Sequence, residues 1–201
     1  MSPTYLKLTA AVLALALSSQ VQASVVFSDD FESYPLQLNA PMTPNWTVTN
    51  GTVDVIGAPP AFFDFLPGNG HYVDLAGSTG AFGLLSTVSS FAAGSYTLSF
   101  GLAGTQRSPD NTTRISLGNW STSLSPLASD PFTTYTFSFT TTGGVLSFQD
   151  SGPAGNEGNL LDNVVLSAVP EPSTWALMIA GFAVVGLGLR RRAPARMTRL
   201  A

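Results

Sequence analysis

Long stretches of the sequence alternate between bulky apolar and small polar residues, and this alternation constrains the fold more than any other feature. SYTLSFGLAG (95–104) places Tyr, Leu and Phe on one face of an extended chain, and TYTFSFTTTGG (134–144) does the same with three aromatic rings. Successive side chains of a strand point to opposite faces, so a period of two is typical of strands with one buried face. Residues 24–168 show no apolar period of a helix.

Turn residues divide this segment into short strands. WTVTNGTVDVI (46–56) predicts a hairpin around its Asn-Gly pair, and RISLGNWSTSL (114–124) predicts another around its Gly-Asn pair. VLSFQD (145–150) and LLDNVVLSAV (160–169) add two further strands. About nine or ten short strands with turns of this kind are typical of an antiparallel β-sandwich, an all-β fold. The aromatic faces then fill the space between the two sheets.

The charges of the predicted sandwich are strongly one-sided. Between residues 24 and 168, Arg107 and Arg114 face eleven acids, which gives a net charge of −9. Such a domain repels nucleic acid and anionic lipid, and it attracts cations. The chain has no cysteine, which excludes disulfides, thiolate metal sites and a cysteine nucleophile.

The first residues have the three parts of a secretory signal peptide. Lys7 precedes the apolar run 8–17, and small Val21 and Ala23 occupy the positions that a signal peptidase inspects. The run is too short to span a membrane well, which favours cleavage after Ala23 over an uncleaved anchor. We therefore expect an exported protein.

An apolar segment followed by arginines lies near the end of the chain. Trp175–Leu189 contains no charge, and as a helix it is roughly 22 Å long, against about 30 Å for the hydrocarbon core of a bilayer. Two prolines, Pro170 and Pro172, prevent the helix from extending backwards. The arginines should remain in the cytoplasm, with the acidic domain outside. Physical reasoning alone does not decide between a permanent anchor and a temporary one.

VPEPSTWALMIAGFAVVGLGLRRR (169–192) resembles the PEP-CTERM sorting signal of Gram-negative bacteria. The resemblance implies recognition by an exosortase, transient anchoring in the inner membrane by the C-terminal helix, and transfer to the cell surface or extracellular matrix. The motif residues that match are Pro170, Glu171, Pro172, Arg190, Arg191 and Arg192. The expected organisation is a signal peptide (1–23), a sandwich (24–168), a sorting signal (169–192, with its helix at about 175–189 and basic cluster at 190–192) and a cytoplasmic tail (193–201).

A second resemblance joins the two ends of the sandwich. FSDDFESYP (27–35) and GNLLDNVVLSAV (158–169) are similar to the first and last strands of galactose-binding-like jelly rolls, the fold of many carbohydrate-binding modules. That fold often holds a structural Ca²⁺ between these strands, and the matching positions are Glu32 and Asp162. Hard carboxylate oxygens suit Ca²⁺. The alternative is that both are ordinary acids of a strand end and a turn.

Sugar binding commonly uses exposed aromatic rings, and Trp46 and Trp120 are candidates, with core packing as the alternative role for each. Catalysis has less support, because His71 is the single histidine and the sequence contains no GxSxG motif. Paired carboxylates could hydrolyse glycosides, but the sequence does not place them relative to one another. We predict a non-catalytic protein that binds extracellular polysaccharide. A structural matrix protein without a discrete ligand is the rival, and a glycoside-processing enzyme is the third possibility.

Overall fold

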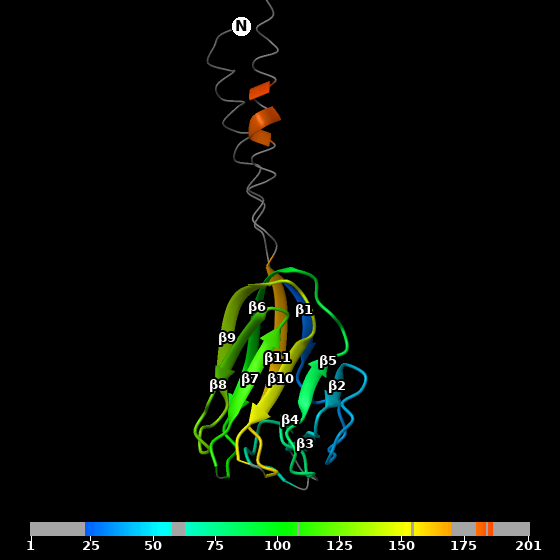
Figure 1. Cartoon of the computed structure of the whole chain (residues 1–201), viewed down its shortest axis with the longest axis vertical. Helices are drawn as coiled ribbons and strands as arrows, with labels where there is room; N and C mark the ends of the chain where they lie inside the picture. Colours follow the sequence, from blue (N-terminus) through cyan, green and yellow to red (C-terminus); the bar gives the residue numbers. More distant parts are fainter. Residues whose placement is uncertain are drawn as a thin grey trace, which may run out of the picture. The chain divides into compact units, whose positions relative to one another are not determined.

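The computed structural model describes residues 23–57, 63–107, 109–153, 155–169, 180–183 and 185–186. The chain divides into two units, and Ala23–Val169 is the compact one described below. This unit is an antiparallel sandwich of two β-sheets, as the sequence predicts (Figure 1).

The larger sheet has six strands in the order β3-β4-β11-β6-β9, and β1 also pairs with β11. The strand β11 is its centre, because it pairs antiparallel with β6 on one side and with β4 and then β1 on the other. The first and last strands of the sandwich are therefore direct neighbours. The members are β1 (Ser24–Asp29), β3 (Asp54–Gly57), β4 (His71–Asp74), β6 (Gly94–Ala103), β9 (Thr133–Thr141) and β11 (Leu160–Val169).

The smaller sheet has five strands in the order β2-β5-β10-β7-β8. It lies in front of the six-stranded sheet in the view of Figure 1. Each neighbouring pair is antiparallel. The members are β2 (Trp46–Thr49), β5 (Leu84–Thr87), β7 (Thr112–Leu117), β8 (Trp120–Leu124) and β10 (Leu146–Ser151).

The core between the sheets comes from the alternating faces that the sequence predicts. The strands β6 and β9 pair with each other, so that Tyr96 lies opposite Phe139 and Phe100 lies opposite Tyr135. Phe148 of the smaller sheet meets Phe100 edge to face, with 5.2 Å between ring centroids. Ring pairs in this geometry stabilise a core beyond the area they bury.

One predicted hairpin is wrong and the other is confirmed. The two halves of the segment 46–56 belong to different sheets, since β2 pairs with β5 and β3 pairs with β4. The Asn-Gly pair turns the chain across the sandwich, and all four residues of β3 are buried, whereas a hairpin strand with alternating exposure was expected. The second segment forms the hairpin β7–β8, in which Leu117 pairs with Trp120 and Gly118 adopts a positive φ of 57°.

The targeting segments lie largely outside the described residues. This is true of the predicted signal peptide up to Gln22, of Pro170, Glu171 and Pro172, of the arginines Arg190, Arg191 and Arg192, and of the predicted cytoplasmic tail. Residues 180–183 and 185–186, inside the predicted transmembrane segment, are helical. Within the described part of the chain, helical residues form no apolar segment of membrane-spanning length.

Candidate functional site

The carboxylate of Asp29, at the end of β1, is buried and serves as an acceptor for four donors. The backbone N–H of Phe31 donates to Oδ1 at 2.9 Å. Oδ2 accepts hydrogen bonds from the Tyr34 hydroxyl at 3.0 Å, Asn45 Nδ2 at 3.1 Å and Trp46 Nε1 at 2.9 Å. Burying a carboxylate is tolerable only when its oxygens are satisfied in this way. Asp29 thus fixes the loop after β1 and the start of β2.

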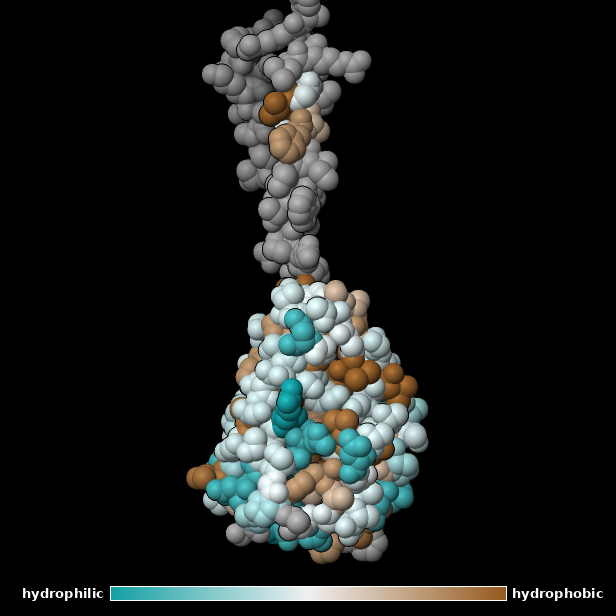
Figure 2. Space-filling model, in the orientation of Figure 1, coloured by the Kyte–Doolittle hydropathy of each residue, from teal (hydrophilic) through white to brown (hydrophobic). Residues whose placement is uncertain are grey.

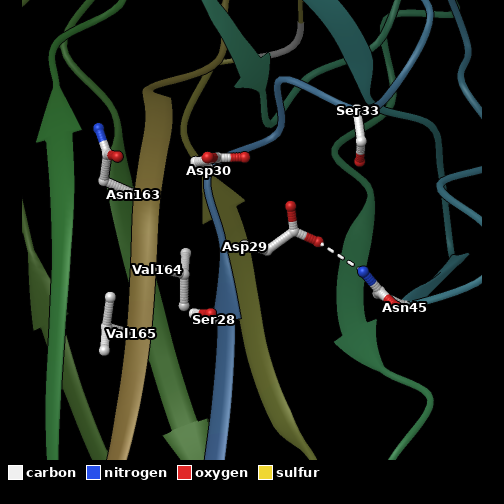
Figure 3. A pocket seen from close by; sticks show the side chains of 8 residues that line it. All are labelled: Ser28, Asp29, Asp30, Ser33, Asn45, Asn163, Val164 and Val165. Atoms are coloured by element: carbon white, nitrogen blue, oxygen red, sulfur yellow. Dashed lines mark hydrogen bonds between the residues drawn. The ribbon is translucent and has the colours of Figure 1, made fainter. Parts of the chain in front are cut away.

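A pocket of about 350 Å³ opens beside this carboxylate, against residues of the paired strands β1 and β11 and of the loop after β1. It is lined by Asp29, Asp30 and Ser33 from the β1 side and by Asn163 and Val165 from β11, among others. Figure 3 shows the Asp29 carboxylate turned toward Asn45, on the far side from β11. The lining is mostly polar, and its formal charges are negative.

The structure brings Glu32 and Asp162 close enough to influence each other. Burial raises the pKa of Asp162 to about 7, and the negative charges of Glu32 and Asp30 act in the same direction. Asp162 lies where β11 departs from regular pairing with β6, and Asn163 has a positive φ of 51°. The Asp162 oxygens accept bonds from the backbone N–H and side-chain amide of Asn163, at 2.7 and 2.8 Å. Glu32 Oε1 accepts the backbone N–H of His71 at 2.9 Å.

The carboxylates of Glu32 and Asp162 are suitable metal ligands, but two side chains are too few to hold a metal ion by themselves. Among the described residues, no three His, Asp or Glu side chains gather to hold a metal ion. A calcium site at this place would therefore need backbone carbonyl oxygens and water besides Glu32 and Asp162. The negative charges of Glu32 and Asp30 beside Asp162 are the feature that a divalent ion would offset.

The two tryptophans predicted to bind sugar lie in different surroundings. Trp46 is fully buried, and its indole packs against Phe27 and Phe148 while its N–H bonds to Asp29. A ring in this position has no face open to a sugar. Trp120 is half-buried on β8 and stacks on Phe139, with 3.8 Å between centroids and 8° between planes.

The other buried acids are also tied into the fold. Asp74 forms an ion pair with Arg107 at 2.7 Å, and burial raises its pKa well above the usual value. Asp150 accepts bonds from the Thr113 hydroxyl at 2.6 Å and from the backbone N–H of Asn159 at 2.6 Å, and burial raises its pKa to about 7. These partners hold loops and neighbouring strands together.

A row of hydroxyl residues crosses the outer face of the five-stranded sheet, and its central member, Ser147, is itself buried at 8% exposure. In register across β2, β5, β10, β7 and β8 lie Thr47, Ser86, Ser147, Ser116 and Ser121. The hydroxyls of Ser86 and Ser147 are 2.9 Å apart. The adjacent row contains Thr49, Leu84, Gln149, Arg114 and Ser123. In Figure 2 the face over these strands is largely white, the colour of residues of intermediate hydropathy, with teal near its centre and brown patches beside the teal.

Sequence reasoning missed this hydroxyl face. The signal was present, because the polar positions of the alternating strands are almost all Ser or Thr. Strand order and register were not predictable from single strands, and only they place the five hydroxyls in one row.

Residues 168–192 match the family model of the PEP-CTERM protein-sorting motif, which confirms the resemblance found in the sequence. The matched segment begins inside β11, which ends at Val169. The motif implies an exported, surface-sorted protein and processing by an exosortase. None of the curated proteins matches the chain.

Several solved β-sandwich domains are similar to the chain in structure. The K3 cleaved adhesin domain of Lys-gingipain from Porphyromonas gingivalis has 18% identity and a TM-score of 0.46, with 73% of this chain and 99% of that chain covered. A tandem of family 22 carbohydrate-binding modules from Paenibacillus barcinonensis has 17% identity and a TM-score of 0.48, with 77% and 49% covered. An exo-β-1,3-galactanase from Phanerochaete chrysosporium has 14% identity and a TM-score of 0.41, with 72% and 29% covered. At these scores the likeness assigns no ligand or activity.

The substitution Trp46→Phe tests the structural role of the buried indole. It removes one hydrogen bond to a buried carboxylate, so the free energy of unfolding should fall by about 1.5–3 kcal/mol, as measured by denaturant titration. Trp120→Phe is the control, because that ring is half-buried and its packing is largely retained. Equal losses in the two variants would contradict the assignment of Trp46 to the Asp29 network.

Proposed function

We propose that the protein is an exported, non-catalytic surface protein that binds neutral extracellular polysaccharide through the outer face of the five-stranded sheet. The observation that supports this most is the row of five hydroxyl groups beside Gln149 and Arg114. Neighbouring strands are about 4.8 Å apart, and the members of the row on either side of the buried Ser147 are at least partly exposed, so they present donors and acceptors at short intervals. An extended sugar chain offers hydroxyl groups at comparable intervals.

The charge of the domain favours a neutral partner. A net charge of −9 repels acidic polysaccharide, and Arg114 is the single formal charge within the two rows. The guanidinium and the Gln149 amide can donate several hydrogen bonds to sugar oxygens. Recognition then depends on many weak polar contacts over a broad face.

The arrangement of the acids supports a non-catalytic role. A retaining or inverting glycosidase needs two carboxyl groups that face the substrate. Of the two aspartates that line the pocket beside β1, Asp29 is committed to four donors, which leaves Asp30 without a second free carboxylate there. Asp74 and Asp150 are buried and hydrogen-bonded elsewhere. The third possibility, a glycoside-processing enzyme, has less support than binding.

We assign the sandwich to the galactose-binding-like jelly rolls. The support is the antiparallel pairing of β1 with β11, which joins the two segments on which the sequence resemblance rests.

The position of β11 also limits where the sorting signal can be cut. Since β11 continues to Val169, processing should occur beyond that residue and leave the central strand intact.

A structural matrix role without a discrete ligand is the second candidate. A specific observation favours it, namely that the outermost strand β9 is long and uncharged. Such an edge can pair with other chains. The two roles are compatible, because β9 and the five-stranded face belong to different sheets.

Affinity electrophoresis in gels that contain dextran, xylan or β-1,3-galactan tests the binding proposal. At least one polysaccharide should retard the protein. The double substitution Arg114→Ala with Gln149→Ala should weaken binding about fivefold or more, because each lost hydrogen bond contributes about 0.5–3 kcal/mol. The prediction that Trp120 contacts sugar can be tested in the same gels with the variant Trp120→Ala.

The matched control is Thr97→Ala with Ser138→Ala, which removes two hydroxyls from the outer face of the other sheet. This variant should bind as the wild type does. If no neutral polysaccharide retards the protein, or if the control weakens binding as much, the proposed face is wrong and the matrix role gains support.

We also propose that Glu32 and Asp162 bind a structural Ca²⁺, which would join the two ends of the sandwich. An ion that binds only the folded chain stabilises it by about 2.7 kcal/mol at one hundred times its Kd. Removal of Ca²⁺ with EGTA should then lower the thermal midpoint by roughly 5–10 °C, at about 2–4 °C per kcal/mol. Added Ca²⁺ should restore it.

The variant Asp162→Ala should abolish this response, whereas Glu157→Ala, which removes one acid from another loop, should retain it. A melting curve that is the same in EGTA and in Ca²⁺ would overturn the site and leave both acids as parts of a strand end and a bulge.

A further inference from the structure

The strand β9 forms an outer edge of the six-stranded sheet and has unusual composition for that position. Its nine residues carry no charge, and the sequence contains none between Asp130 and Asp150. Exposed edges normally carry charges, prolines or bulges, or are very short, because an unprotected edge is a template for another strand.

The other outer strands of the described sandwich have the protection that β9 lacks. The strands β2 and β3 have four residues each, and β8 has five. The strand β1 has an irregularity between Val25 and Phe27 and ends in an aspartate. By contrast, β9 pairs with β6 through nine consecutive residue pairs without a shift in register. Its free edge therefore presents regularly spaced backbone N–H and C=O groups.

The sequence of β9 is nearly a palindrome. TTYTFSFTT has Phe137 at its centre, and each residue before it has a chemically similar residue at the same distance after it. In an antiparallel pair of two β9 strands centred on Phe137, Thr lies opposite Thr at both ends, Tyr135 lies opposite Phe139, and Thr136 lies opposite Ser138. Like would therefore meet like along the whole strand.

Both faces of β9 suit such a pair. On the inner face Tyr135, Phe137 and Phe139 are only half-buried, so they retain apolar surface for new neighbours. On the outer face Thr136, Ser138 and Thr140 already pair by hydroxyl hydrogen bonds with β6, at 3.4, 3.2 and 3.1 Å. A second β9 would continue both patterns, since aromatic and hydroxyl pairs across strands each stabilise a sheet.

We propose that β9 pairs antiparallel with β9 of a second copy of this chain, about a two-fold axis at Phe137. The pair joins two six-stranded sheets into one sheet of twelve strands. A two-fold interface requires a self-complementary surface, and the near-palindrome supplies it. The contact also brings together the uncharged parts of two acidic domains. Salt should strengthen the association, because it screens the remaining repulsion between the two negatively charged domains. This inference is independent of polysaccharide binding.

Disulfide trapping tests the register directly, because the chain has no native cysteine. Two full-length variants, Thr136→Cys and Ser138→Cys, are expressed with tags of different size, mixed and oxidised. Both positions are exposed. Directly opposed side chains have Cβ atoms about 4.5–5.5 Å apart, against 7–8 Å for diagonal neighbours. The mixture should therefore give the mixed dimer in several-fold excess over either variant alone.

Charge substitutions at the same positions test the interface without a covalent bond. Thr136→Lys with Ser138→Lys opposes like charges in the pair and should remove the association of the full chain in sedimentation measurements. Thr136→Lys with Ser138→Glu opposes unlike charges and should retain it. Thr47→Lys with Thr49→Lys on β2 is the matched control for added charge and should also retain it.

Thermal melting of each variant checks that the sandwich is intact. The proposal is overturned if the mixed disulfide is no more abundant than the self-disulfides, or if the double lysine variant on β9 associates as the wild type does. It is equally overturned if Thr136→Lys with Ser138→Glu dissociates, because the register would then be wrong. Association through the C-terminal segment would be insensitive to all of these changes.

Discussion

The sandwich depends on aspartates that are buried almost without cations. Five are less than 9% exposed, and the described residues contain one ion pair, between Arg107 and Asp74. Hydrogen bonds from backbone N–H groups, hydroxyls, amides and an indole satisfy most of the others. Several of these bonds attach a loop to a strand end, as at Asp29 and Asp74, which helps to define the loops of a chain without disulfides. The five are Asp29, Asp54, Asp74, Asp150 and Asp162.

This constraint shapes what the surface can do. Five of the eleven acids of the sandwich are buried inside the fold, and the outer faces of both sheets carry mainly uncharged Ser and Thr residues. One face presents the hydroxyl row with Gln149 and Arg114, and the other presents hydroxyl pairs between β6 and β9. The two proposals, polysaccharide binding and strand pairing through β9, both depend on extended, weak polar contacts and sheet edges. Repetition at a cell surface strengthens such contacts through high effective concentration.

The sequence was sufficient to predict the fold class, because the alternation of apolar and polar residues indicates which face of a strand is buried. The sorting motif was recognisable because its parts are contiguous in the sequence. The hairpin at 46–56 was predicted wrongly, since alternation cannot say whether two adjacent strands share a sheet. Trp46 illustrates the limit for sites. In the sequence, an aromatic residue beside polar residues is typical of a sugar-binding surface. Only the fold shows that the indole N–H of Trp46 is buried and donates to Asp29. Glu32 and Asp162 were predicted because the resemblance joined the two ends of the sandwich; the structure brings them near each other, and the metal site stays a prediction.

The pH dependence of stability tests the structural role of the aspartates most directly. A carboxyl whose pKa is raised by folding stabilises the fold most below its unfolded value near 4, and this contribution is lost as the pH rises through the folded value. Burial raises the pKa of Asp150 and Asp162 to about 7 and raises that of Asp74 as well. The thermal midpoint, measured in EGTA, should therefore fall as the pH increases from 5 to 8. A midpoint that is higher at pH 8 than at pH 5 would contradict the account.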